Sequence, residues 1–117
     1  MNIEDTRLFC LNKKGVTESF PFDDTTLVFK VLGKMFALLN LANNQSINLK
    51  CDPDKAIELR EHYASVLPGY HMNKKHWNTV LLDESIHDDI FKGWITNSYN
   101  LIVNKFPKKL KEEYNNL

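Results

Sequence analysis

The chain has 117 residues, 43% of them hydrophobic and 26% charged, and its 15 Lys and Arg residues balance 15 Asp and Glu residues. This length and composition fit one globular domain, residues 1–117, built around a single hydrophobic core. The zero net charge argues against a general polyanion binder but leaves a local basic surface open. Two isolated cysteines, Cys10 and Cys51, argue against a disulfide framework or zinc finger. No apolar run approaches the ~18 residues of a membrane span, so we expect a cytoplasmic protein.

The N-terminal half is predicted to contain one helix and three strands. Residues 2–13 form the helix, and residues 14–24, punctuated by glycine, proline and aspartate, form irregular chain or a short strand. Residues 25–41 (TTLVFKVLGKMFALLNL) contain two apolar, β-branched runs on either side of Leu32-Gly33, which is typical of a β-hairpin. Residues 46–51 (SINLKC) supply the third strand.

Alternation along these strands indicates which side chains face the core. A two-residue loop at Leu32-Gly33 would place Phe29 opposite Phe36 and Leu27 opposite Leu38. The apolar faces of the strands and helices together predict a core of Phe29, Phe36, Leu38, Leu49, Leu59, Trp94 and Ile95.

The C-terminal half is predicted to contain a helix, a second hairpin and a long last helix. Asp52 as an N-cap and Pro53 behind it begin the first of these helices. Residues 69–72 and 76–82 form two strands joined by a polar turn at 73–75. Asp83 caps the last helix (84–106), Pro107 ends it, and residues 106–117 form a frayed or short-helical tail. The order α-β(3)-α-β(2)-α predicts an α+β fold, a two-layer antiparallel sheet with helices.

The stretch GYHMNKKHWNTV (69–80) is the densest in side chains that ligate, stack or bind anions, and it contains no acid. His71 and His76 flank the hairpin turn and raise the possibility of a metal site. A third ligand is missing, and the neighbouring lysines repel a metal ion, so histidines that fix the turn are the favoured interpretation. We predict no metal and no cofactor.

Catalytic residues are not apparent either. Cys51 alternates with Ile47 and Leu49 and is interpreted as a buried apolar filler. The sequence has no GxSxG, glycine-rich phosphate loop or HExxH motif, and its paired acids are explained as helix N-termini. We therefore predict no catalytic residues and a protein that is not an enzyme.

Anion binding is the remaining chemistry for this stretch. Lys74 and Lys75 lie at the predicted hairpin tip between the two histidines, and such a tip can lie along a nucleic-acid backbone like a wing. Trp77 can either stack on a base or pack on the core. The structural alternative is that lysines at hairpin tips are common solubilising and edge-protecting residues.

Five stretches in order along the chain resemble the MmcQ/YjbR family of small bacterial proteins: VTESFPF (16–22), LVFKVLGKMFALL (27–39), INLKCDP (47–53), PGYHMNKKHWNTV (68–80) and SYNLIVNKFPKK (98–109). The resemblance implies a secretion-chaperone-like α+β fold and DNA binding through a "double wing" of hairpins. The family pattern marks Lys30, Gly33, Lys34, Lys50, Asp52, Pro53, Tyr70, His71, Lys74, His76, Trp77, Asn78, Ser98 and Tyr99.

Two hypotheses follow for the function. In the first, the protein binds DNA, with Trp77 anchoring the second hairpin to the last helix and Tyr70 packing beside Trp77. The contact set is Lys30, Lys34, Lys50, His71, Lys74, Lys75, His76 and Asn78. In the second, it is a non-enzymatic module that binds a protein partner or a second copy of itself. The second hypothesis relies on an apolar patch formed by Val28, Met35, Ala37 and Leu39. Neither a membrane partner nor a small-molecule substrate is predicted.

Overall fold

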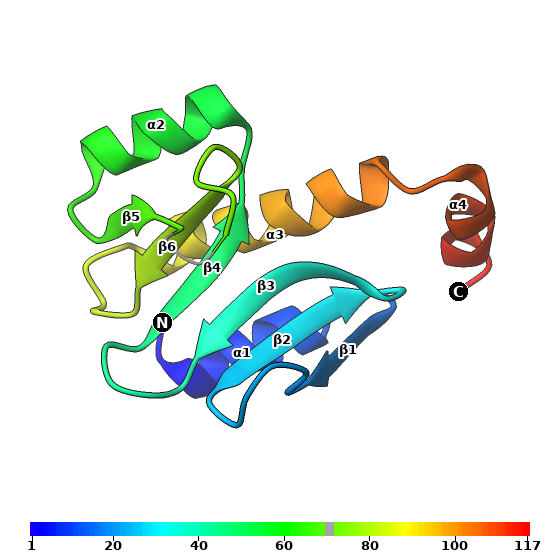
Figure 1. Ribbon diagram of the computed structural model, residues 1–117, viewed down its shortest axis with the longest axis horizontal. Helices are drawn as coiled ribbons and strands as arrows, with labels where there is room; N and C mark the ends of the chain where they lie inside the picture. The colour runs from blue at the N-terminus through cyan, green and yellow to red at the C-terminus, as the bar shows by residue number, and fades with distance from the viewer. Residues whose placement is uncertain (70–71) are drawn as a thin grey trace.

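The computed structural model spans residues 1–117 and describes all of them except residues 70 and 71 (Figure 1). Predictions that involve Tyr70 and His71 therefore lie outside the described residues. In chain order the elements are α1 (Ile3–Leu11), β1 (Val16–Ser19), β2 (Thr26–Val31), β3 (Lys34–Asn40), β4 (Ser46–Lys50), α2 (Pro53–His62), β5 (Val66–Pro68), β6 (Trp77–Leu81), α3 (Asp88–Asn104) and α4 (Lys108–Asn115).

The strands form one antiparallel sheet of six strands in the order β1-β2-β3-β4-β6-β5. Buried residues of α1, α2 and α3 join one hydrophobic cluster with one face of this sheet, so the helices cover a single face. The predicted α+β fold is confirmed. Residues 16–19, which the sequence left between irregular chain and a short strand, form the edge strand β1.

The first hairpin turns at Leu32-Gly33, as predicted. Both residues have positive φ angles, 46° at Leu32 and 83° at Gly33. Two central residues with positive φ match the right-handed twist of the flanking strands, and glycine adopts this conformation without steric cost.

The predicted register of this hairpin is wrong by one residue. Phe29 lies opposite Ala37 rather than Phe36, and Leu27 lies opposite Leu39 rather than Leu38. The register shifts between Phe29 and Lys30, where β3 carries one residue more than β2. Such a β-bulge bends and twists its strand, and here it buries the consecutive Phe36 and Ala37 in the same cluster beneath the helices.

Ser98 of α3 joins the two strands that part beyond this bulge. The pairing of β3 with β4 reaches only as far as Ala37 and Leu49. Beyond that pair, the fully buried Ser98 Oγ donates to the Phe36 carbonyl at 2.6 Å and accepts from the Lys50 N–H at 2.8 Å. One hydroxyl thus satisfies two backbone groups that a parted ladder would leave unpaired.

Two segments of the C-terminal half differ from the prediction. The described residues 69 and 72 of the strand expected at 69–72 lie outside any strand, and the strand β5 lies earlier, at Val66–Pro68. The last helix begins at Asp88 rather than at residue 84. Asp83 does not cap it, because its carboxylate accepts from the backbone N–H and hydroxyl of Ser85, and His87 Nδ1 accepts from the Asp89 N–H instead.

The α2 helix begins as predicted at Pro53, with Asp52 in the N-cap position, but the Asp52 side chain makes no capping hydrogen bond. At the C-terminus, the predicted tail contains helix α4, whose Leu110 and Tyr114 pack against the core. The Tyr114 hydroxyl lies 2.8 Å from the Tyr99 hydroxyl, which also bonds the Lys14 carbonyl. This contact ties the tail to α3.

The predicted core is buried except for Trp94, which is partly exposed. Leu38 is buried in a second, smaller cluster with Val28 and Trp77. Alternation along the strands places this cluster on the sheet face away from the helices. The sheet therefore carries apolar packing on both faces.

Replacing Gly33 with Ala should lower the free energy of unfolding by about 1 kcal/mol, because alanine at φ 83° is strained although no atom lies near the added carbon. Gly93 is the matched control: it lies in α3 with open space around it, so Gly93→Ala should raise stability by about 0.5–1 kcal/mol. Urea unfolding of both variants measures the difference. The same sign of change in both would contradict the turn geometry.

Replacing Ser98 with Ala should cost about 1–3 kcal/mol, because it leaves the Phe36 carbonyl and the Lys50 N–H without their partner. Asn100→Ala, on the exposed side of the same helix, should change stability by less than about 0.5 kcal/mol. Thermal unfolding followed by circular dichroism compares the two. Equal melting temperatures would show that the hydroxyl bridge does not stabilise the fold.

Candidate nucleic-acid interface

The connections between elements fall into two groups, because neighbouring strands of an antiparallel sheet run in opposite directions. One end of the sheet, here called the basic end, is formed by residues 12–15, 32–33, 51–52, 69, 72–76 and 105–107. The other, here called the acidic end, is formed by residues 20–25, 41–45, 63–65 and 82–87.

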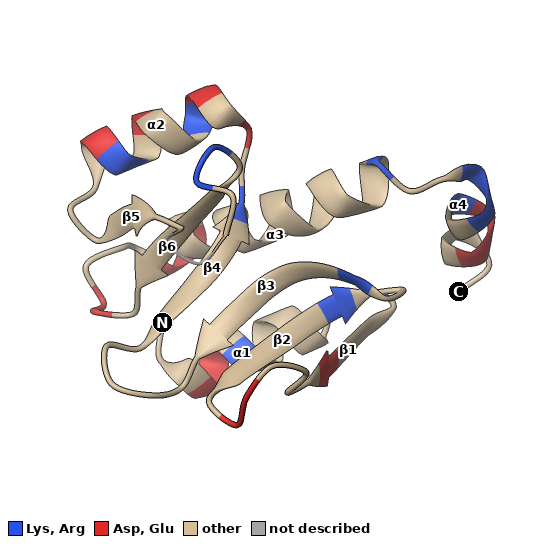
Figure 2. Ribbon diagram, viewed as in Figure 1, with Lys and Arg blue, Asp and Glu red and all other residues tan. Residues whose placement is uncertain are grey.

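Charge is sorted between these two ends (Figure 2). The connections of the acidic end contain Asp23, Asp24, Asp83 and Glu84 and no lysine or arginine. In the connections of the basic end and the strand residues beside them, the only acid is Asp52. The lysines there are Lys13, Lys14, Lys30, Lys34, Lys50, Lys74, Lys75 and Lys105. Although the net charge of the chain is zero, positive charges are concentrated at one end of the sheet and negative charges at the other.

Five lysines of the basic end lie on two diverging arms of the sheet (Figure 2): Lys30, Lys34, Lys50, Lys74 and Lys75. Lys30 and the exposed Lys34 lie at the tip of the β2–β3 hairpin. Lys50 ends β4 on the other arm, where its register partner is Trp77. The Cys51 N–H donates to the His76 carbonyl at 2.7 Å, which holds the 73–76 turn beside the end of β4.

The turn that presents Lys74 and Lys75 is ordered by local hydrogen bonds. Asn73 Oδ1 accepts from the Lys75 N–H at 3.0 Å, and the Asn73 carbonyl accepts from the N–H groups of His76 and Trp77. Gly69 closes the base of the loop: its N–H bonds the Trp77 carbonyl, and a side-chain carbon there would lie 2.9 Å from that oxygen. Both lysines are exposed on this framework.

Asn78 is not available for nucleic-acid contact. It is 2% exposed, and its amide nitrogen donates to the Ala56 carbonyl while its oxygen accepts from Arg60 at 2.9 Å. Arg60 also donates to the Lys74 carbonyl at 3.1 Å, so it connects α2 to the lysine turn. The sequence did not single out Arg60, because nothing local marks an arginine whose partners lie 14 and 18 residues away.

Trp77 is buried, as expected if it packs on the core rather than stacking on a base. It does not pack against the last helix. It packs with Val28 and Leu38 on the face away from α3, with Met35 and Met72 partly covering them. The predicted anchoring of the hairpin to the last helix by Trp77 is therefore wrong. Since only 8% of the residue is exposed, its ring offers no stacking face to a base.

The apolar patch of the protein-interaction hypothesis does not exist as an exposed surface. Val28, Ala37 and Leu39 are fully buried, and only Met35 is partly exposed. The physical reason is that β2 and β3 are central strands with packing on both faces.

Two lysines of the basic end have distinctive surroundings. Burial, followed by the positive charge of Lys105, lowers the pKa of Lys50. Lys13 is held by the fold: its ammonium donates to Thr96 Oγ1 at 2.8 Å and lies 4.7 Å from the centre of the Phe9 ring, and burial lowers its pKa. Lys13 is thus a structural residue. Lys105 lies near Lys50 and adds a positive charge to the basic end, although the predicted contact set did not include it.

Outside residues 70–71, no group of three or more His, Cys, Asp or Glu side chains is arranged to hold a metal ion. Every helix in the same part of the chain is too short or too polar to span a bilayer. Burial raises the pKa of Cys10 to about 12 and also raises that of Cys51, so neither thiol is activated as a nucleophile.

The sequence of this chain is similar to a known family model and to the sequences of known bacterial proteins. The YjbR family model matches residues 11–101. The chain belongs to the YjbR family. It is 38% identical over 107 residues to the uncharacterized protein YbdF of Escherichia coli O157:H7, covering 91% of this chain and 88% of that one. It is 32% identical over 113 residues to the uncharacterized protein YjbR of Escherichia coli K12, covering 96% of each.

Solved structures agree with this assignment. The crystal structure of Deinococcus radiodurans protein DR2400, a DUF419 domain, matches with a TM-score of 0.88 and 40% identity, over 97% of this chain and 88% of that one. A Pseudomonas syringae protein matches with a TM-score of 0.76 and 27% identity, over 86% and 98%. The family resemblance of the sequence is confirmed, and the names of these relatives assign no activity.

Proposed function

We propose that this protein binds nucleic acid, and duplex DNA in particular, through the phosphate contacts of its basic end. The observation that carries the proposal is the sorting of charge between the two ends of the sheet. A surface that gathers lysines while acids lie at the opposite end attracts and orients a polyanion even when the net charge is zero. This arrangement answers the main objection raised by the composition.

The two arms supply separate groups of phosphate contacts. Lys30 and Lys34 present one group at the β2–β3 tip, and Lys74 and Lys75 present the other on the ordered 73–76 turn. Lysine ammonium groups bind phosphates as point charges and carry no base-edge pattern, so the contacts position the protein without reading sequence. Binding should then be weak and non-specific, with a Kd of about 10⁻⁴–10⁻⁶ M at physiological salt.

The protein-interaction alternative has lost the surface on which it relied, since Val28, Ala37 and Leu39 are buried. Large exposed apolar side chains of another segment, Phe20 and Phe22, lie at the acidic end, 48% and 65% exposed. They are away from the lysine arms, so a partner bound there would leave the basic end open.

Replacing Lys74 and Lys75 together with Ala should reduce the magnitude of the slope of log Kobs against log [salt] by about 1.8, because each neutralised phosphate contributes about 0.9. The loss should be similar for unrelated duplex sequences. Fluorescence anisotropy with labelled random duplexes across a salt series measures it. Lys30→Ala/Lys34→Ala should give a comparable loss if both arms touch the same duplex.

Arg7→Ala/Lys92→Ala is the charge-matched control, because it removes two positive charges from α1 and α3 away from the basic end. Its salt slope should equal that of the wild type. If all three double variants behave alike, or if the wild type binds neither duplex nor single-stranded DNA, the nucleic-acid proposal fails and the protein-interaction alternative remains.

A further inference from the structure

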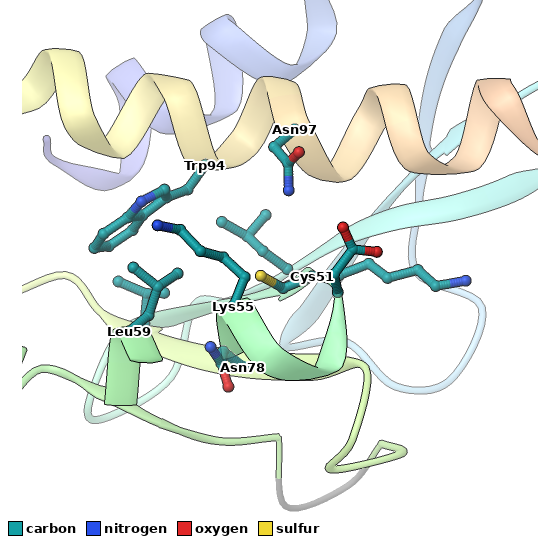
Figure 3. Close-up of a pocket in the computed structure, with 10 residues that line it drawn as sticks. Cys51, Lys55, Leu59, Asn78, Trp94 and Asn97 are labelled. Carbon is teal, nitrogen blue, oxygen red and sulfur yellow. The ribbon is translucent and has the colours of Figure 1, made fainter. Parts of the chain in front are cut away.

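A cavity of about 370 Å³ lies between α2 and α3, above strands β4 and β6 (Figure 3). Its volume is within the roughly 300–1,000 Å³ of small-molecule sites. Apolar side chains from four elements line it: Leu49, Leu59, Val80 and Trp94. Trp94 is the one predicted core residue that stays partly exposed, because part of its ring faces this cavity rather than packed protein.

Two of the three charged side chains at the cavity are cationic. Lys50 and Lys55 line it, against the single carboxylate of Asp52. Lys55 has only a long, exposed contact with Glu58 at 3.4 Å, which holds it weakly. Lys50 is partly buried and forms no ion pair within the described part of the chain, and Lys105 adds a further positive charge nearby. In the part of the chain that the structure describes, Lys50 therefore has no anionic partner, and the anionic partner of Lys55 is the exposed Glu58.

The side chains are directed so that one ligand can meet both the apolar wall and a cation. In Figure 3, Lys55 extends from α2 across the cavity toward Trp94, and Asn97 extends from α3 into the space above Cys51. An amide and an ammonium group therefore border a space whose walls are aliphatic and aromatic. Such sites bind a ligand's body by apolar contact and fix its orientation by a few polar groups.

We infer that this cavity binds a small organic anion with a flat apolar body, of the aromatic carboxylate or sulfonate class. Its ring system packs against Trp94, Leu59 and Val80, and its anionic group accepts from Lys55 and Asn97. An inorganic anion would leave the apolar walls uncovered, and a neutral aromatic molecule would make no charge-assisted contact with the lysines. The site lies on the helix-covered face, and Lys55, Trp94 and Asn97 do not belong to the proposed nucleic-acid contact set.

The probe for this inference is 8-anilinonaphthalene-1-sulfonate, titrated against the folded protein with its own fluorescence and that of tryptophan as readouts. We expect saturable binding of one molecule per chain, with quenching of Trp94. Trp94→Phe should abolish most of the tryptophan response, whereas Trp77, on the other face of the sheet, remains as the unaffected emitter. Naphthalene and sulfate, which each carry half of the required chemistry, should compete poorly.

Lys55→Gln should weaken probe binding by about tenfold, the effect of one charge-assisted contact at a partly exposed site. Asn97→Trp, at an exposed position on the cavity rim, should abolish binding by filling the space. Lys109→Gln, exposed on α4, is the matched charge control and should bind like the wild type. Cooperative thermal melts of each variant establish that the probe reports on folded protein.

Equal probe affinity in the wild type, Lys55→Gln and Asn97→Trp would overturn the inference, as would binding that does not saturate. The result is independent of the nucleic-acid proposal, because Lys55→Gln leaves the lysines of both arms in place. Loss of DNA binding in the arm variants with intact probe binding, or the reverse, assigns each failure to its own site.

Discussion

The two hydrogen bonds of the Ser98 hydroxyl hold strands β3 and β4 at the point where they part. The hydroxyl bonds Phe36 on β3 and Lys50 on β4 just where the two strands stop pairing. Without it, a buried carbonyl and a buried N–H would lack partners, which costs more than most single contacts contribute. With it, the strands can part without that cost. The lysine arms diverge from this point, and the cavity lies beside it between α2 and α3.

The antiparallel topology of the sheet separates positive from negative charge between its two ends. Alternate connections fall at the same end of the sheet, so charges that are scattered along the chain are collected in space. Lysines gather at one end and the acids of residues 20–25 and 82–87 at the other. Net charge and composition average over the surface and therefore contain no information about this sorting.

Several of the mistaken residue assignments concern the direction in which a side chain points. One extra residue at Phe36 moved the register of the first hairpin. On β6, Trp77 faces the small cluster beside Val28, and its neighbour Asn78 faces α2, where Ala56 and Arg60 bond it. A polar residue interpreted as a surface contact thus became a buried link between helix and sheet.

Local sequence patterns predict the turn at Leu32-Gly33, the start of α2 at Pro53 and most of the core, because turn chemistry, helix-start signals and periodicity are local properties. The family was identified from five sequence stretches in order along the chain. The folded structure was needed to show that residues 16–19 join the sheet, that α3 begins at Asp88, and that the lysines share one end. These features depend on partners far along the chain. Ser98 and Phe36 are 62 residues apart, and no pattern within a single segment records their hydrogen bond.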